Sequence, residues 1–330
     1  MTAAQHGSAL RRSALPVGLI LLLLILNTVK SPGFLAVHSV NGALTGSLID
    51  IANRAAPVMI LAFGMTLVIA TGGIDLSVGS LVAISGSLTA YLITSRPNLP
   101  VFGALTLSLG LSLILGAING LLVGTFRIQP IVATLVLMVS GRGVAQLLTQ
   151  GQMIRLSDQT LSYWKAGRLF GLPTSIYLAL VAGLLLFALT RGTALGLFLE
   201  ATGDSERAAE TAGIDVRGVK LAAYAVSGLC AGLAGLVIMS DTHVADANSA
   251  GLYMELDAIL AVVLGGTLLK GGRFSLAGSV LGALLIQTLT TTILTTGVKP
   301  EANLIVKATM VLVACLLQSE RFRAKFRRKA

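Results

Sequence analysis

Six polar or charged side chains stand inside otherwise apolar stretches of the sequence, and they are the first candidates for chemistry. They are Asp75, Asn119, Thr134, Arg142, Gln146 and Gln287. In apolar surroundings such groups either hydrogen-bond to neighbouring helices or contact a polar solute that passes between the helices. Both interpretations stay open, and we treat these residues as candidates for lining a substrate path.

Asp75 and Arg142 have the most distinctive surroundings. Asp75 follows Gly72 and Gly73, so its carboxylate is placed to cap the N-terminus of a helix after a turn that the glycines permit. The alternative is that this break lines a path or a gate. Arg142 falls inside an apolar stretch, where a charge is costly. We therefore expect it to face protein or a cavity, or to extend outward to the membrane surface.

The residue types that catalysis or metal binding requires are sparse. His6, His38 and His243 are far apart, and the two cysteines, Cys230 and Cys315, each lie in an apolar stretch. The sequence holds no phosphate-binding loop of the form GxxxxGK[ST]. We expect no catalytic residue and no metal, and any ATPase activity must come from another chain.

Four acidic residues gather in the segment 240–257, between two apolar stretches. They are Asp241, Asp246, Glu255 and Asp257. They form either a solvated loop or a docking surface for a protein whose own loops are basic.

A short helix is predicted over residues 202–214. Asp204 and Glu206 favour its N-terminus, Gly213 suits a left-handed C-terminal position, and small alanines share one face. The helix either lies on the rest of the molecule or inserts into the groove of a partner. The residues that we assign to such docking are Gly203, Glu206, Ala208, Ala209 and Gly213.

The elements that must position these residues are membrane helices. The chain has 330 residues, of which 55% are hydrophobic and 12% charged, with a mean hydropathy of +0.87. A soluble protein has about twice that share of charged residues, and the apolar stretches do not alternate as barrel strands do. We expect one all-α transmembrane domain over 1–330, with about ten spans near 14–29, 55–71, 76–95, 100–123, 129–149, 172–190, 219–239, 256–269, 275–296 and 303–318.

Glycine pairs interrupt two of the predicted spans. The glycines that we interpret as helix breaks are Gly72, Gly73, Gly265, Gly266, Gly271 and Gly272. Broken helices at membrane depth are tolerated only where protein or a water-filled cavity surrounds them, which is typical of transporters.

Basic residues predict the orientation. About twice as many Lys and Arg lie on the side of the two termini as on the other side, so the termini (1–13 and 320–330) and the loop 191–218 are expected to be cytoplasmic. The first apolar stretch lacks a cleavage site and is interpreted as an uncleaved anchor. Half of the net charge of +10 lies in the tail 320–330, which indicates anionic lipid and no nucleic-acid partner.

Three segments resemble, in order, the permease subunits of ribose-type sugar importers of the ATP-binding-cassette class. They are GMTLVIATGGIDLSVGS (64–80), QPIVATL (129–135) and VLGGTLLKGGR (263–273). Within that family, the segments 49–57, 141–147, 245–252 and 255–263 are similar to galactofuranose-importer permeases of enteric bacteria.

The resemblance implies a permease that carries a monosaccharide, galactofuranose in the first instance, into the cytoplasm by alternating access. It implies a bacterial inner-membrane location and three protein partners: a second, paralogous permease chain, an ATPase that binds ATP and Mg²⁺, and a periplasmic sugar-binding protein. It also implies that the helix 202–214 couples the permease to the ATPase. Because Ile131 and the segment 267–269 depart from the family pattern, ribose and xylose remain alternatives.

A proton- or sodium-coupled secondary transporter is the main alternative of another class. It would need carboxylates buried in the middle of the spans, whereas most acidic residues of this sequence lie in loops.

Overall fold

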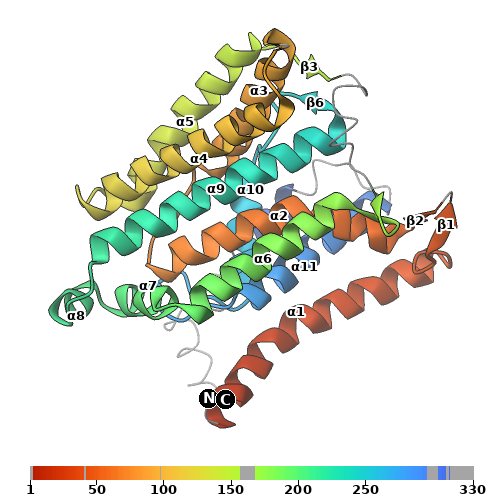
Figure 1. Cartoon of the computed structure of the whole chain (residues 1–330). Coiled ribbons are helices and arrows are strands. Elements are labelled where there is room, and N and C mark those ends of the chain that lie inside the picture. Colours follow the sequence, from red (N-terminus) through yellow and green to blue (C-terminus); the bar gives the residue numbers. More distant parts are fainter. Residues whose placement is uncertain are drawn as a thin grey trace.

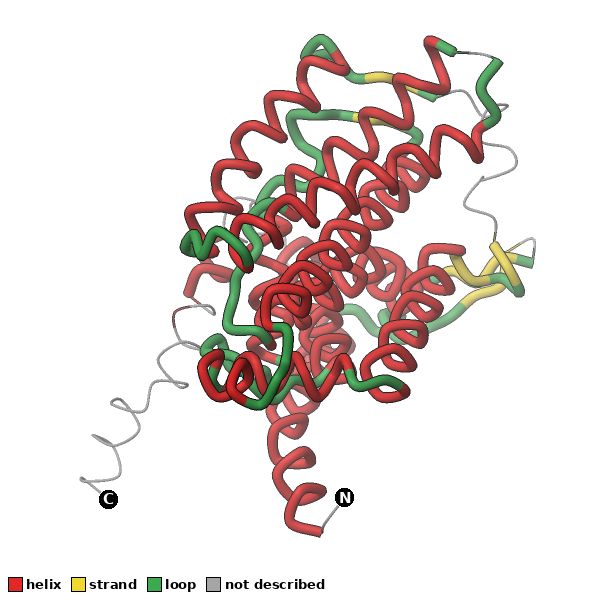
Figure 2. The backbone as a smooth tube through the Cα atoms, turned by 60° about the vertical axis from the view of Figure 1, so that its left-hand side comes forward, coloured by secondary structure: helices red, strands yellow, loops and turns green. Residues whose placement is uncertain are grey.

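The computed structural model describes residues 3–40, 42–96, 98–156, 168–295, 304–309 and 312. This part is mainly helical, with three pairs of short antiparallel strands (Figures 1 and 2). The helices are α1 (Ala3–Lys30), α2 (Ser47–Ala70), α3 (Val78–Ser95), α4 (Val101–Gly124), α5 (Pro130–Thr149), α6 (Thr174–Gly192), α7 (Leu195–Asp204), α8 (Glu206–Thr211), α9 (Val216–Thr242), α10 (Met254–Leu264) and α11 (Leu276–Thr295).

The strand pairs lie at one end of the helix bundle. The β1–β2 hairpin (His38–Val40 and Ala43–Thr45) precedes α2, β3 (Ile154–Arg155) pairs with β6 (Val244–Ala245), and β4 (Arg168–Leu169) pairs with β5 (Leu172–Pro173). We call this the hairpin end, and the opposite end, where α7 and α8 lie, the α8 end (Figure 1).

Seven helices are long and apolar enough to cross a membrane, which confirms a multi-span helical protein. They are α2, α3, α4, α5, α6, α9 and α11, and they match seven of the predicted spans. The first predicted span corresponds to a shorter apolar stretch, Pro16–Lys30, within α1. The predicted count of ten is not established, because most of 303–318 lies outside the described residues, as does the tail 320–330.

Helices α2 and α9 form the centre of the bundle. The apolar window of α2 is 78% buried, and α2 packs against α6, α9, α10 and α11. Close packing of α4 on α9 depends on glycine: a Cβ at Gly228 would come within 2.9 Å of the Cα of Gly116. The windows of α5 and α6 are only 22% buried, so these helices leave apolar faces exposed, as a lipid-facing helix does.

Both predicted helix breaks are present. Helix α2 ends at Ala70, and Gly72 follows with φ +79°, a left-handed conformation that glycine adopts without strain. Helix α10 ends at Leu264 after only 11 residues, so the eighth predicted span, 256–269, is shorter than expected. The glycines that follow α10 in left-handed conformations are Gly266, Gly271 and Gly272.

The single helix predicted over 202–214 is wrong. Two helices meet there, because α7 ends at Asp204 and α8 begins at Glu206. Ser205 between them has extended backbone, and its Oγ accepts a hydrogen bond of 3.4 Å from the Ala208 N–H. The N-cap of α8 is therefore Ser205, and Asp204 belongs to the helix before it.

Candidate functional site

Asp75 is completely buried between α2 and α3. Its Oδ1 accepts hydrogen bonds from the N–H (3.0 Å) and Oγ (2.6 Å) of Ser77, and its Oδ2 accepts one from Ser227 Oγ of α9 at 2.9 Å. The predicted helix cap is wrong in position, because Ser77 is the residue that precedes α3. The carboxylate instead ties the segment 71–77 to α9.

Two more of the predicted path residues join the same segment. Asn119 of α4 donates from Nδ2 to Ser77 Oγ at 2.9 Å. Thr134 of α5 accepts at Oγ1 from the Leu76 N–H at 3.1 Å and donates to Pro130 O at 2.9 Å. Hydrogen bonds thus occupy Thr134 Oγ1 and Asn119 Nδ2, whereas the buried Asn119 Oδ1 has no hydrogen-bond partner among the described residues. A contact with a transported solute stays a prediction.

Arg142 and Gln146 lie elsewhere on α5, toward the hairpin end. Arg142 Nη1 donates to the carbonyls of Ala247 (2.9 Å) and Ala250 (2.6 Å), and Gln146 Nε2 donates to Asn248 Oδ1 at 2.9 Å. Arg142 therefore faces protein, which is one of the placements expected for it. Both side chains fix the loop between α9 and α10.

Gln287, the sixth predicted path residue, is buried on α11, which packs against α1, α2 and α10. The six residues thus fall into three separate places: the segment 71–77, the hairpin end of α5, and α11. That they line a substrate path stays a prediction.

Two of the four predicted docking acids lie at the surface of the hairpin end. Asp241 accepts a 3.0 Å hydrogen bond at Oδ2 from Asn53 Nδ2. Asp246 accepts hydrogen bonds from Ser249 Oγ at 2.5 Å and from the Asn248 N–H at 2.9 Å. The bond from Ser249, together with those from the backbone, holds the pKa of Asp246 below its usual range, so this carboxylate stays charged.

The other two acids are not surface residues, which corrects the prediction. Glu255 is only 5% exposed and lies on the first turn of α10 against Gly79. Asp257 pairs with Lys307 at 2.7 Å, and the two side chains are 14% and 18% exposed. An enclosed ion pair of this kind holds helices together and leaves no charge for a partner protein.

Glycines join the α8 end to both helix breaks. Gly272 N–H donates to Ala70 O at 2.9 Å, at the end of α2. Gly203 of α7 packs so closely on this pair that a Cβ would clash with Ala70 O and Gly272 N, and a Cβ at Gly271 would lie 2.9 Å from Gly203 O and from Gly72 N. Gly203 is therefore a packing residue, placed inside the molecule rather than on a docking face. The backbones of three segments touch here, and a side chain would separate them.

Helix α8 presents most of its side chains outward. Glu206, Ala208 and Gly213 are exposed, whereas Ala209 is buried, so the proposed shared face of small residues is only partly available to a partner. Gly213 has φ +83° just after α8, the left-handed conformation predicted for it.

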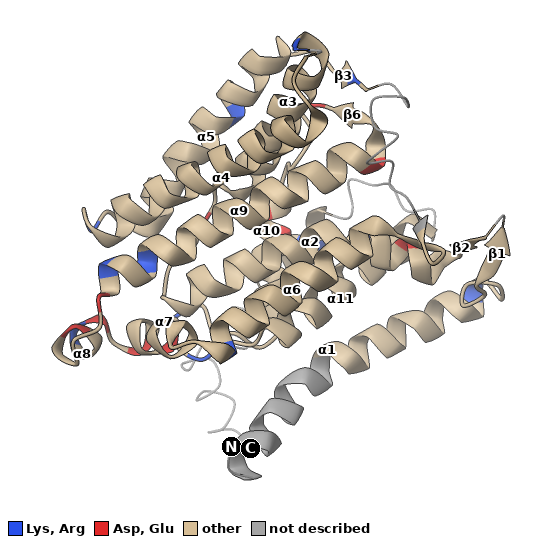
Figure 3. Ribbon diagram, viewed as in Figure 1, with Lys and Arg blue, Asp and Glu red and all other residues tan. Residues whose placement is uncertain are grey.

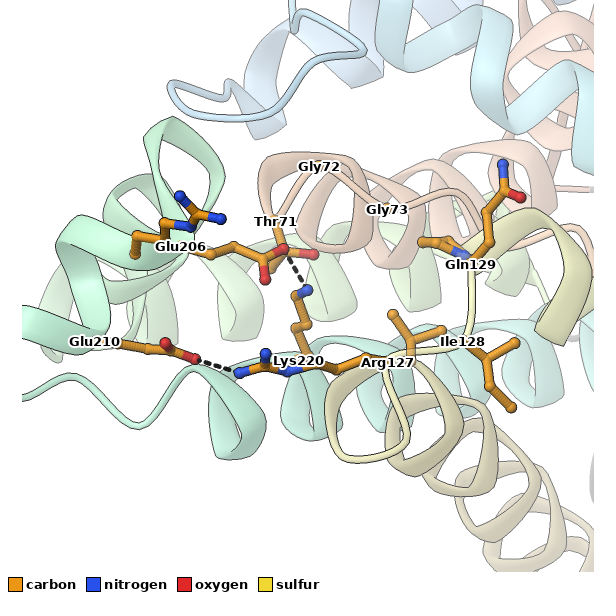
Figure 4. A pocket seen from close by; sticks show the side chains of 12 residues that line it. Thr71, Gly72, Gly73, Arg127, Ile128, Gln129, Glu206, Glu210 and Lys220 are labelled. Carbon is orange, nitrogen blue, oxygen red and sulfur yellow. Dashed lines mark hydrogen bonds and ion pairs between the residues drawn. The ribbon is translucent and has the colours of Figure 1, made fainter.

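Two ion pairs that the sequence did not suggest connect α8 to the bundle. Lys220 Nζ of α9 pairs with Glu206 Oε1, and Arg127 Nη2, after α4, pairs with Glu210 Oε1 at 3.3 Å (Figure 4). Between α8 and the break after α2 lies a cavity of about 380 Å³, which these four residues line together with Thr71, Gly72 and Gly73. In the sequence, the basic residues near this short helix, which carries two glutamates, were the feature from which these ion pairs could have been predicted.

Charged side chains gather around α7 and α8 and at the loops of the hairpin end (Figure 3). Within the described ranges, no group of three His, Cys, Asp or Glu residues is arranged to hold a metal ion. The arrangement offers a short, largely exposed helix next to the break after α2 and a few polar contacts.

Comparison with known proteins gives a consistent result. Residues 47–315 match the family described as the permease component of the branched-chain amino acid transport system. The chain is 50% identical to the galactofuranose transporter permease protein YtfT of Escherichia coli K12, over 94% of this chain and 92% of that one. It is 37% identical to the fructose import permease protein FruF of Bifidobacterium longum (91% and 85% covered) and 35% identical to the ribose import permease protein RbsC of Escherichia coli K12 (92% of each). No solved structure matches.

Proposed function

The chain belongs to the family of permease components of branched-chain amino acid transport systems, and we propose that it carries galactofuranose across the bacterial inner membrane. The observation that carries this proposal is the 50% identity, over nearly the whole chain, to a galactofuranose permease. It is a multi-pass permease of an ATP-binding-cassette sugar importer, since relatives named for ribose and fructose match over the same length. Ribose is the second candidate substrate, because the ribose permeases of Escherichia coli, Haemophilus influenzae and Bacillus subtilis match at 33% to 38% identity.

Helix α8 is the proposed coupling element to a partner ATPase that binds ATP and Mg²⁺. It stands at one end of the bundle with Glu206 and Ala208 exposed, and the α7 segment that precedes it packs on both helix breaks through Gly203. A displacement of α8 by the ATPase would therefore act on the broken helices directly. Alternating access requires such a contact, because nucleotide binding shifts the equilibrium between two conformations only when it stabilises one conformation more than the other.

The α8 end is the proposed cytoplasmic side. The basic residues of this end are Arg127, Arg191, Arg207, Arg217, Lys220 and Lys270, which fits the excess of positive charge in cytoplasmic loops. The hairpin end then faces the periplasm, where the exposed Asp241 and the half-buried Asp246 are available to a sugar-binding protein. The exposed apolar faces of α4, α5 and α6 are available to lipid and to a second permease chain.

The experiment that tests this function measures ATP hydrolysis by the reconstituted importer. The chain is co-expressed with an ATPase, a second permease and a sugar-binding protein from its source, and the complex is purified into lipid. We expect the loaded binding protein to stimulate ATP hydrolysis with galactofuranose and less with ribose, fructose or galactopyranose. Equal stimulation by all these sugars would contradict galactofuranose as the substrate, and no stimulation by any sugar would contradict sugar import.

A further inference from the structure

Helix α8 is too short to hold its own orientation. It has six residues, and isolated helices of that length are unstable in water. Ala209 is its buried residue, whereas the cap at Ser205 is a hydrogen bond to Ala208 of α8 itself. The direction in which α8 points must therefore be fixed by longer side chains that extend from it to the bundle.

The inner of the two ion pairs is the more enclosed. Lys220 is 11% exposed at its side chain and Glu206 52%, and Lys220 Nζ meets Glu206 Oε1 on the first turn of α8 (Figure 4). Lys220 belongs to α9, the helix that also carries Ser227, a partner of the buried Asp75. Because the lysine end of this pair is shielded from solvent, salt screens it less than a pair that is open at both ends, and the contact links α8 to a central helix.

The outer ion pair is far more open. Arg127 and Glu210 are 70% and 44% exposed at their side chains, and they meet at 3.3 Å. Arg127 has a left-handed backbone with φ +55°, which a non-glycine residue adopts only under local constraint. Exposed pairs contribute little and are screened by salt, so this contact breaks first.

The cavity gives α8 room to move. The residues of both ion pairs line its wall, and Thr71 and Gly72, just after α2, lie on another side (Figure 4). Opening of the outer pair would leave α8 held by the inner pair and by the buried Ala209, with this cavity beside it.

We infer that Lys220 and Arg127 are positioning residues for coupling: the inner ion pair transmits movement of α8 to α9, and the outer ion pair holds α8 in place until it moves. This inference rests on the proposed function of α8 as the coupling helix. It predicts that the two pairs differ in importance, with the inner pair required for coupling and the outer pair adjusting it.

Charge reversal and charge exchange test the inference in the complete importer. The inner variants are Glu206→Lys, Lys220→Glu and their double exchange. The outer variants are Glu210→Arg, Arg127→Glu and their double exchange. The control is Arg217→Glu, an exposed charge reversal on α9. The readout is the number of sugar molecules imported per ATP hydrolysed. We expect each inner reversal to lower this ratio at least about fivefold, each outer reversal about twofold, and each exchange to restore at least about half of the loss.

Gel filtration of each complex separates a coupling defect from a folding defect, because a misfolded complex does not elute as a single peak. Each double exchange keeps one positive and one negative charge in the pair with their positions swapped. Exchanges that behave no better than the single reversals, or inner reversals that leave the ratio unchanged, would overturn the inference. Failure of the proposed function is distinguishable, because the unmodified complex would then show no ATP-driven uptake.

Discussion

At the scale of residues, most polar groups inside the bundle are occupied by protein partners. Asp75 accepts from Ser77 and Ser227, and Arg142 donates to two carbonyls of the loop before α10. These contacts join α3, α5 and α9 to loops and breaks that must keep their shape within the bundle. The polar residues therefore hold the framework.

The meeting of Asp75, Asn119 and Thr134 was not predictable from their positions, because they come from separate elements whose packing the sequence does not reveal. The burial of Asp257 was predictable in part. Lys307 falls inside the predicted span 303–318, and a buried cation requires an anion, which Asp257 supplies. The acidic segment 240–257 reads as one loop in the sequence, whereas Asp257 belongs to α10, which begins at Met254.

Removing the Asp75 carboxylate is expected to destabilise the break after α2. Asp75→Ala leaves the Ser77 N–H and the Ser227 hydroxyl without their acceptor, which costs about 1–3 kcal/mol, whereas Asp75→Asn keeps one oxygen and costs less. The measurement is the temperature at which the purified protein loses its gel-filtration peak. Asp215→Ala, which removes a carboxylate that makes no capping bond to α9, is the control. Equal melting of the alanine, asparagine and parent proteins would contradict the account of this cluster.

Asp246 is expected to contribute to docking at any pH of the periplasm. Its pKa is lowered, so its charge is present at higher pH and is lost only as pH falls through that lowered value, below the usual aspartate range of about 4. Asp246→Asn should raise the half-saturating concentration of binding protein about threefold to tenfold, equally at about pH 5.5 and pH 7.5. Asp50→Asn, an exposed acid of the same end, should have no effect. A loss seen at only one of the two pH values would disprove this assignment.

At the scale of elements, the helix breaks were predictable and the junction between them was not. Glycine pairs indicated where α2 and α10 end, because glycine disfavours helix and readily adopts a left-handed backbone conformation. Gly203 looked like part of a docking helix, yet it packs against Ala70 and Gly272. A close backbone contact between distant segments gives no local sequence pattern by which it could be predicted. The Ser205 cap was not predicted, because the acidic residues on both sides of it are equally typical of a helix N-terminus.

The two alanines of α8 are expected to respond differently to a bulky charge. Ala208 is exposed, so Ala208→Arg should leave the permease folded and lower co-purification of the ATPase at least about tenfold. Ala209 is buried, so Ala209→Arg should reduce the yield of folded permease itself. Ala194→Arg, at the exposed start of α7, is the control. Undiminished ATPase binding by the Ala208 variant would exclude this face of α8 as the docking surface.

At the scale of the whole molecule, the chain separates its tasks between two ends. The α8 end carries charge, the cavity and the glycine junction, while the hairpin end carries the strand pairs and the two surface acids Asp241 and Asp246. Between them lie apolar helices. The low share of charged residues, 12%, predicted a membrane protein. The composition does not predict which end of the molecule faces which partner, because that depends on the folded chain.

Sugar uptake into proteoliposomes tests the central claim most directly. The complete importer is reconstituted with ATP inside and sugar-loaded binding protein outside, and uptake of labelled galactofuranose is followed with and without a protonophore. The account predicts uptake that requires both ATP and the binding protein and that persists with the protonophore. Uptake that proceeds without ATP and stops with the protonophore would contradict it, because the chain would then be a proton-coupled carrier.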